Sequence, residues 1–91
     1  MPTKLQIPPR LARYAAGQRS FELPASSIDE LVRGLCDMHA DLRARLVDDQ
    51  GKLYSYLAVI FNEKQLSPAE LNDLRLSDGD HVEIVTLASG G

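Results

Sequence analysis

The last two residues of the sequence, Gly90 and Gly91, place a carboxylate at the end of a segment that has no side chains. A carboxylate is an unreactive electrophile at neutral pH, so it must become a mixed anhydride before a nucleophile can attack it. Glycine lacks a Cβ atom and permits any φ, so a diglycine segment can pass through a narrow channel into a closed active site. If the chain takes part in covalent chemistry, we expect the Gly91 carboxylate to be the reacting group.

A glycine-rich chain end is often only disordered, so the diglycine indicates a function only if the segment before it supports one. Apolar and polar residues alternate over residues 81–84, which predicts a half-buried final strand that runs on to Leu87. Residues 88–91 follow that strand directly. We therefore expect one folded domain over residues 1–87 and a flexible tail over residues 88–91.

The other residues that could carry chemistry form no known constellation. The single Cys36 cannot form an internal disulfide, and with only His39 and His81 no zinc-site spacing can be written. We expect Cys36 to be a small buried hydrophobe. The acidic pairs Asp48-Asp49 and Asp78-Gly79-Asp80 lie in predicted turns, where carboxylates commonly cap the backbone. We expect no catalytic residue, no bound metal and no bound cofactor, and hence a protein that is not itself an enzyme.

Composition narrows the class of partner. The chain has 91 residues, 44% of them hydrophobic and 25% charged, which suits one soluble domain. A net charge of -3 argues against binding to nucleic acid or to anionic lipid, and favours protein partners with basic surfaces. No apolar run is long enough to cross a membrane and the N-terminus lacks the layout of a signal peptide, so we expect a cytoplasmic protein.

The first half of the chain predicts two strands followed by one main helix. Short alternating segments around residues 5–7 and 21–23 are expected to pair as a hairpin. The run Ser27-Ile28-Asp29-Glu30 has the form of a capping box, in which the first hydroxyl accepts from the last amide while the last carboxylate reaches back. Apolar residues then recur at helical spacing, with a possible break near Asp41; they are Ile28, Leu31, Val32, Leu35, Leu42 and Leu46.

The second half predicts two more strands. Residues 53–61 are rich in β-branched and aromatic residues, and if the odd-numbered ones from Leu57 face the core, then Ala58 and Ile60 lie on the outer face. Asn62-Glu63 is expected to turn the chain, and residues 67–76 to form an irregular connection with at most one helical turn.

This order of elements predicts an α+β fold with a mixed sheet of about four to five strands packed on one main helix. The first and last strands are expected to be parallel neighbours at its centre. On the outer face near the root of the tail we expect an exposed apolar patch that binds a partner, with His81 and Glu83 at its rim. The members of this predicted patch are Ile60, Ala58, Val85 and Leu87.

Three motifs follow one another in the second half of the chain, and further short motifs precede them. The three are Phe61-Asn62-Glu63, then Leu76-Ser77-Asp78-Gly79-Asp80 leading to Val82-Glu83-Ile84-Val85, and last Gly90-Gly91. This order resembles the MoaD/ThiS family of ubiquitin-like sulfur carriers, which have the β-grasp fold, over nearly the whole chain. The earlier motifs are similar to those of the CysO-like branch, namely Ile7-Pro8, Gly17-Gln18 and Gly51-Lys52-Leu53.

The resemblance implies that a ubiquitin-activating-type enzyme uses ATP to adenylate Gly91. The adenylate then becomes a thiocarboxylate that donates sulfur in the biosynthesis of cysteine or another sulfur-containing metabolite. Gly90 and Ser89 would thread into the partner's active site, although Ser89 stands where many relatives have Ala or Gly. A sulfur-acceptor enzyme and a JAMM-type metalloprotease are further implied partners. Three alternatives stay open: the small subunit of molybdopterin synthase, a ubiquitin-like modifier conjugated to lysines, and a noncovalent interaction module.

Overall fold

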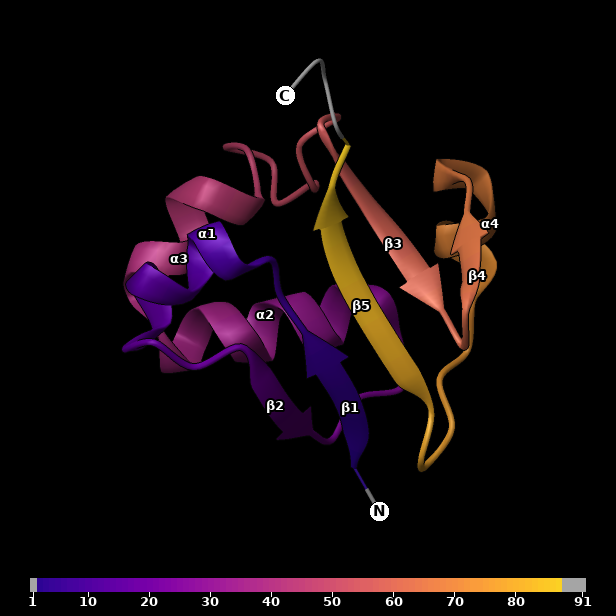
Figure 1. Ribbon diagram of the computed structural model, residues 1–91. Helices are drawn as coiled ribbons and strands as arrows, with labels where there is room; N and C mark the ends of the chain where they lie inside the picture. The colour runs from indigo at the N-terminus through magenta and orange to yellow at the C-terminus, as the bar shows by residue number, and fades with distance from the viewer. Residues whose placement is uncertain (1, 88–91) are drawn as a thin grey trace.

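The computed structural model describes residues 2–87, which form one mixed sheet with helices (Figure 1). The strands are β1 (Thr3–Gln6), β2 (Ser20–Leu23), β3 (Leu57–Phe61), β4 (Lys64–Leu66) and β5 (His81–Thr86). The helices are α1 (Pro9–Ala12), the 3-10 turn η1 (Arg13–Ala15), α2 (Ile28–Met38), α3 (Ala40–Leu46) and α4 (Pro68–Asp73). The predicted α+β class is confirmed, and α1 and η1 lie between the two strands that we expected to pair as a hairpin.

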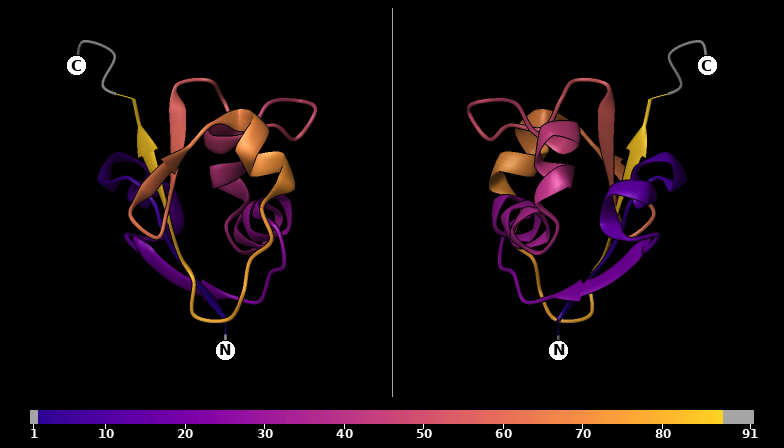
Figure 2. Two further views of the ribbon diagram at one scale, coloured as in Figure 1. Left: turned by 90° about the vertical axis from the view of Figure 1, so that its right-hand side faces the viewer. Right: turned by 90° about the vertical axis from the view of Figure 1, so that its left-hand side faces the viewer.

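The sheet has the strand order β2-β1-β5-β3-β4. β5 lies parallel to β1 and antiparallel to β3, and the outer pairs β1–β2 and β3–β4 are antiparallel. The prediction that the first and last strands are central parallel neighbours is therefore confirmed. Both side views show α2 and α3 on one side of the sheet, so one face is covered by helices (Figure 2).

The core lies between the sheet and the helices. Apolar residues of β1, β3 and β5 alternate into it, as the period of two in a strand requires. α2 and α3 contribute the stripe that the sequence predicts. The largest fully buried apolar side chains come from these five elements and from Ile7, which directly follows β1. They are Leu5, Ile7, Leu31, Leu35, Leu42, Leu46, Val59, Val82 and Ile84.

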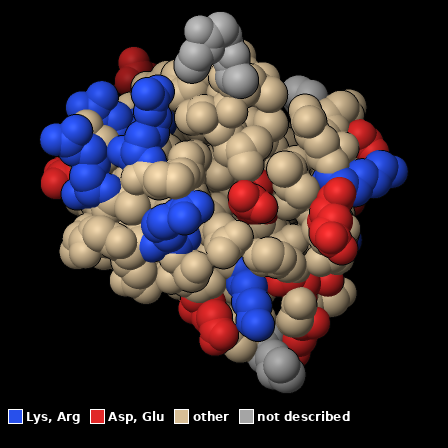
Figure 3. All heavy atoms as spheres, in the orientation of Figure 1, with Lys and Arg blue, Asp and Glu red and all other residues tan. Residues whose placement is uncertain are grey.

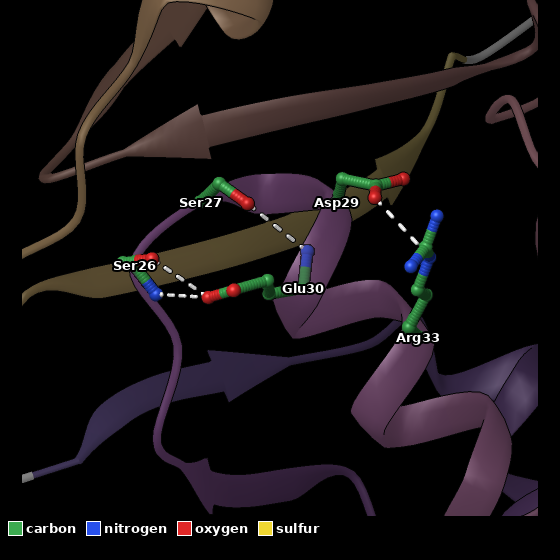
Figure 4. Close-up of polar contacts among 5 residues, drawn as sticks. All are labelled: Ser26, Ser27, Asp29, Glu30 and Arg33. Atoms are coloured by element: carbon green, nitrogen blue, oxygen red, sulfur yellow. Dashed lines mark hydrogen bonds and ion pairs between the residues drawn. The ribbon is translucent and has the colours of Figure 1, made fainter.

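One of the two predicted hydrogen bonds of the capping box forms at the start of α2, and the other has a different partner (Figure 4). The Glu30 amide donates to the Ser27 hydroxyl at 3.1 Å. The Glu30 carboxylate accepts from the amide and the hydroxyl of Ser26, at 2.8 and 2.7 Å, so it reaches one residue further back than a capping box requires. These bonds, first the backbone one and then the hydroxyl one, hold the pKa of the Glu30 carboxyl below its usual value.

The helical region breaks near Asp41, as predicted. α2 ends at Met38 and α3 begins at Ala40, because His39 between them takes a non-helical conformation with φ -137° and ψ 88°. Its ring packs edge-on against Phe21, with the ring centroids 5.6 Å apart. The break lets α3 turn while Leu42 and Leu46 stay in the core.

Two expectations for the second half are wrong in detail. β3 begins at Leu57 rather than at residue 53, because the preceding residues form a turn in which the Leu57 amide donates to the Tyr54 carbonyl. β4 is the fifth strand of the predicted four to five, although the sequence did not indicate its position. The predicted irregular connection contains α4, a six-residue helix with a complete capping box between Ser67 and Glu70 and a proline at its start.

The turn after β3 is hydrogen-bonded to the segment that leads into β5. Asn62 and Glu63 both have positive φ, 46° and 73°, as the predicted turn requires. The Asn62 side chain accepts from the His81 amide at 2.9 Å and donates to the Asp80 carboxylate at 3.3 Å. Asp80 also accepts from the Ser77 amide at 2.7 Å. Two of the motifs behind the resemblance are thus parts of one hydrogen-bonded network.

Candidate functional site at the end of strand β5

The chain leaves the sheet at the end of β5, a central strand. Leu57 of β3 is the register partner of Thr86, and the Leu87 amide donates to the Tyr56 carbonyl at 2.7 Å, one residue beyond the strand. The backbone is therefore held by the sheet up to residue 87. The predicted tail residues Ser89, Gly90 and Gly91 lie outside the described residues.

The sheet places three residues of the predicted patch, Ala58, Ile60 and Val85, on its outer face. Ala58 and Val85 are direct register partners. Because β3 and β5 are antiparallel, Ile60 lies two positions from this pair towards the start of β5, whereas Leu87 follows Val85 by two positions and lies one residue beyond the strand. Their exposure is uneven. Leu87 is 42% exposed, Ile60 and Val85 are half-buried, and Ala58 is only 7% exposed. Ala58 therefore offers little surface to a partner, and we name Ile60, Val85 and Leu87 the outer apolar patch.

The two polar residues that we expected at the rim take different positions. Glu83 is the register partner of Ile60 and is half-buried, so its carboxylate borders the outer apolar patch directly. His81 is exposed at the start of β5, where the hydrogen bonds to Asn62 fix its backbone. The outer apolar patch thus has one acidic neighbour on the same strand.

Tyr56 also belongs to this site, although we did not select it from the sequence. Its side chain is 45% exposed, its hydroxyl donates to the Arg45 carbonyl at 3.1 Å, and its ring stacks on Tyr54 with the centroids 5.3 Å apart. These contacts fix the turn whose carbonyl holds Leu87. The aromatic pair at residues 54 and 56 was visible in the sequence, but its stacking depends on the turn.

The other candidate residues serve the fold. Cys36 is buried among core residues, and this burial raises the pKa of its thiol, as expected for a structural cysteine. Asp48 accepts from the amides of Lys52 and Gln50, at 3.0 and 2.8 Å, and these bonds lower the pKa of its carboxyl. Both acidic pairs therefore include a carboxylate that caps the backbone, Asp48 in one and Asp80 in the other.

Within residues 2–87, no three His, Cys, Asp or Glu side chains gather as metal ligands would. Among the helices that the structure describes, none has the length and apolar composition needed to cross a membrane.

The mixed sheet, its central parallel pair and the helix across one face define a ubiquitin-like β-grasp domain. The model of the ThiS family matches residues 10–91, so the chain belongs to the ThiS family. The family predicted from the sequence is therefore confirmed. Curated proteins give no match to the chain.

Solved structures of the same fold cover almost the whole chain. A structure of the Amycolatopsis orientalis BexX/CysO complex matches with a TM-score of 0.83 and 26% identity, over 98% of this chain and 99% of that one. SAMP1 from Haloferax volcanii matches with a TM-score of 0.81 and 22% identity, over 100% of both chains. Mycobacterium tuberculosis CysO matches with a TM-score of 0.79 and 22% identity, over 92% of this chain and 97% of that one. The presence of CysO structures agrees with the predicted branch.

Proposed function

We propose that the chain is a sulfur carrier whose Gly91 carboxylate is adenylated and then converted to a thiocarboxylate. The observation that carries this proposal is that the ThiS family match extends to Gly91. The residues before this end belong to a central strand, and the sheet holds their backbone in place up to Leu87. The carrier supplies the reacting group. Catalysis, ATP and the sulfur source belong to partner enzymes, and we place the reaction in the cytoplasm.

The proposed chemistry has two steps. A carboxylate oxygen of Gly91 attacks the α-phosphorus of ATP, pyrophosphate leaves, and an acyl adenylate forms. Sulfide then attacks the carbonyl carbon and displaces AMP, which leaves sulfur in place of one oxygen. The thiocarboxylate sulfur attacks an electrophilic carbon held by an acceptor enzyme, and hydrolysis of the acyl C–S bond restores the Gly91 carboxylate and leaves the sulfur on the acceptor, in the synthesis of cysteine or another sulfur-containing metabolite. A JAMM-type metalloprotease is a further candidate partner for release of the product.

We propose that the outer apolar patch docks the activating enzyme while Gly90 and Ser89 enter its active site. Fixing one residue of a chain costs about 1–2 kcal/mol, so holding residues 88–91 in a channel must be offset by contacts with the folded domain. Val85 of the outer apolar patch lies on β5, the strand that leads to those residues, and Ile60 lies on the neighbouring β3. Ile60, Val85 and Leu87 can supply that contact area.

The first step can be measured alone. We mix the carrier with ATP and with an adenylating enzyme of ubiquitin-activating type from the same cell. This mixture should incorporate labelled pyrophosphate into ATP. The exchange requires Gly91, so a chain that ends at residue 89 is the control and should give none. Exchange that proceeds equally with the shortened chain would contradict the proposal.

Conjugation to proteins is the second candidate function, favoured by the likeness to SAMP1, the small archaeal modifier protein 1 of H. volcanii. It shares the adenylation step and differs in the acceptor, which would be a lysine amine. Isopeptide-linked Gly91 in digested cell extract would select this function, whereas a thiocarboxylate without such links would select the carrier.

A further inference from the structure

The side of β5 that faces β1 has a groove at the root of the tail. β1 ends at Gln6, because Pro8 and Pro9 have no amide hydrogen with which to continue a ladder, and the chain turns into α1. Thr86 and Leu87 therefore have no strand beside them on that side. A groove of about 620 Å³ lies there, between the end of β5, α1, η1 and α3.

Three arginines line this groove, which we name the arginine groove: Arg10 of α1, Arg13 of η1 and Arg45 of α3. All three side chains are exposed, and no Asp or Glu of residues 2–87 is among the groove's lining residues. The chain as a whole has 10 basic and 13 acidic residues. The arginine groove is therefore locally positive on a molecule of net negative charge, and Figure 3 shows Lys and Arg gathered over α1 and α3.

Contacts with one aromatic ring hold two of these guanidinium groups in place. The guanidinium carbon of Arg45 lies 4.6 Å from the centroid of the Tyr14 ring, and that of Arg13 lies 5.6 Å from it. A guanidinium held over a ring loses less freedom on binding, and its planar N–H groups suit a carboxylate. The arginine groove is thus prepared to accept acidic groups.

The rim of the arginine groove points to a protein as the source of those acidic groups. Tyr56 and Leu87, 45% and 42% exposed, line the same groove, and arginine with exposed aromatic and apolar residues is the composition of protein interfaces. Four residues span at most about 14 Å, so an enzyme that acts on Gly91 must approach Leu87 within that distance. It necessarily covers this end of the molecule.

We infer that the arginine groove binds an acidic surface beside the active-site entrance of the enzyme that adenylates Gly91. The inference rests on the proposed function. It revises the expectation that partners present basic surfaces, because the charge at the root of the tail is opposite in sign to the net charge.

The test measures pyrophosphate exchange as a function of carrier concentration for Arg10→Glu, Arg13→Glu and a matched control, Arg75→Glu. Arg75 is exposed, lies outside the arginine groove and gives the same change in net charge. We expect KM for the carrier to rise roughly tenfold in the two groove variants with kcat nearly unchanged, and to change little in the control. Added salt should raise KM of the wild type more steeply than that of the groove variants.

Thermal unfolding of each variant shows whether it is folded. If Arg13→Glu unfolds the chain because it loses the contact with Tyr14, Arg10→Glu still tests the inference, since the contacts with this ring come from Arg13 and Arg45. Equal KM values for groove variants and control would overturn the inference while leaving the proposed function intact. The inference would also be overturned if the carrier alone bound ATP and Arg10→Glu abolished this binding, because the arginine groove would then be a nucleotide site. Absence of exchange with the wild type would instead remove the proposed function.

Discussion

Asn62 shows how one residue can join two distant segments. Its positive φ closes the turn after β3, while its side chain bonds to the His81 amide and to Asp80 before β5. Asn62→Ala loses both side-chain bonds and retains an unfavourable φ, so we expect the free energy of unfolding to fall by about 2 kcal/mol. Urea denaturation measures this change.

Asn62→Gly separates the two contributions, because glycine loses the bonds without the conformational cost. It should be less destabilising than Asn62→Ala. Equal stability of wild type and Asn62→Ala would show that the network adds nothing to the fold.

Gly34 and Gly79 should respond to alanine in opposite directions. Gly34 lies inside α2, and a Cβ there would meet Leu23 Cδ1 at 3.8 Å, an ordinary contact. Gly34→Ala is expected to raise the free energy of unfolding by about 0.5–1 kcal/mol, because glycine is a poor helix former. Gly79 has φ +86°, so Gly79→Ala should lower it by roughly 1–2 kcal/mol despite open space around the position. A destabilised Gly34→Ala variant would contradict this account of α2.

At the scale of elements, the starts of α2 and α4 make stability depend on pH. Bonds from Ser26 lower the pKa of Glu30, and bonds from the Ser67 amide and hydroxyl lower that of Glu70. A carboxyl whose pKa is lower in the folded state stabilises the fold above its unfolded pKa, about 4.3, and this stability is lost as pH falls through the folded value. We therefore expect Tm to fall on acidification below about pH 4.3.

The matching variant is Glu30→Gln, which keeps an acceptor but no longer titrates. Its Tm should fall less than that of the wild type over the same pH range. Glu22→Gln removes a carboxylate from β2 rather than from a helix start, and it should keep the wild-type profile. A Glu30→Gln profile that parallels the wild type would show that this helix start is not responsible.

The outer apolar patch is tested at Val85, because Leu87 also lines the arginine groove. Val85→Ser removes a half-buried apolar side chain of the outer face, so we expect KM for the activating enzyme to rise severalfold, with thermal unfolding showing that the variant is folded. Met38→Ser is the control, since Met38 is 53% exposed but lies at the end of α2. An equal effect of both variants on KM would show that docking does not depend on the outer apolar patch.

The sequence predicted elements well where local pattern and packing agree, as in β1, β5 and α2. It predicted α4 poorly although Ser67 and Glu70 carry a capping signal, because Asn72 and Asp73 favour a turn and the packing of Leu71 against the core is a tertiary effect. β4 has three residues, too few for a period to be visible. Its existence depends on pairing with β3 after the Asn62-Glu63 turn.

At the scale of the whole molecule, the two halves of the site differed in how far they could be predicted. The outer apolar patch follows from alternation along β3 and β5, so its members could be named from the sequence, although the burial of Ala58 depends on packing. The arginine groove brings together Arg10, Arg13 and Arg45 from separate helical segments. Their spacing in the sequence does not indicate that they lie together, and the net charge of the chain predicted partners with basic rather than acidic surfaces.

The central claim is that Gly91 carries the chemistry, and intact-mass spectrometry tests it most directly. After incubation with ATP, sulfide or another sulfur donor, and an enzyme active in pyrophosphate exchange, the carrier should gain about 16 Da, since sulfur replaces oxygen. Fragmentation should locate the gain at Gly91. An unchanged mass, or a gain of about 32 Da located at Cys36 as a persulfide, would contradict the account.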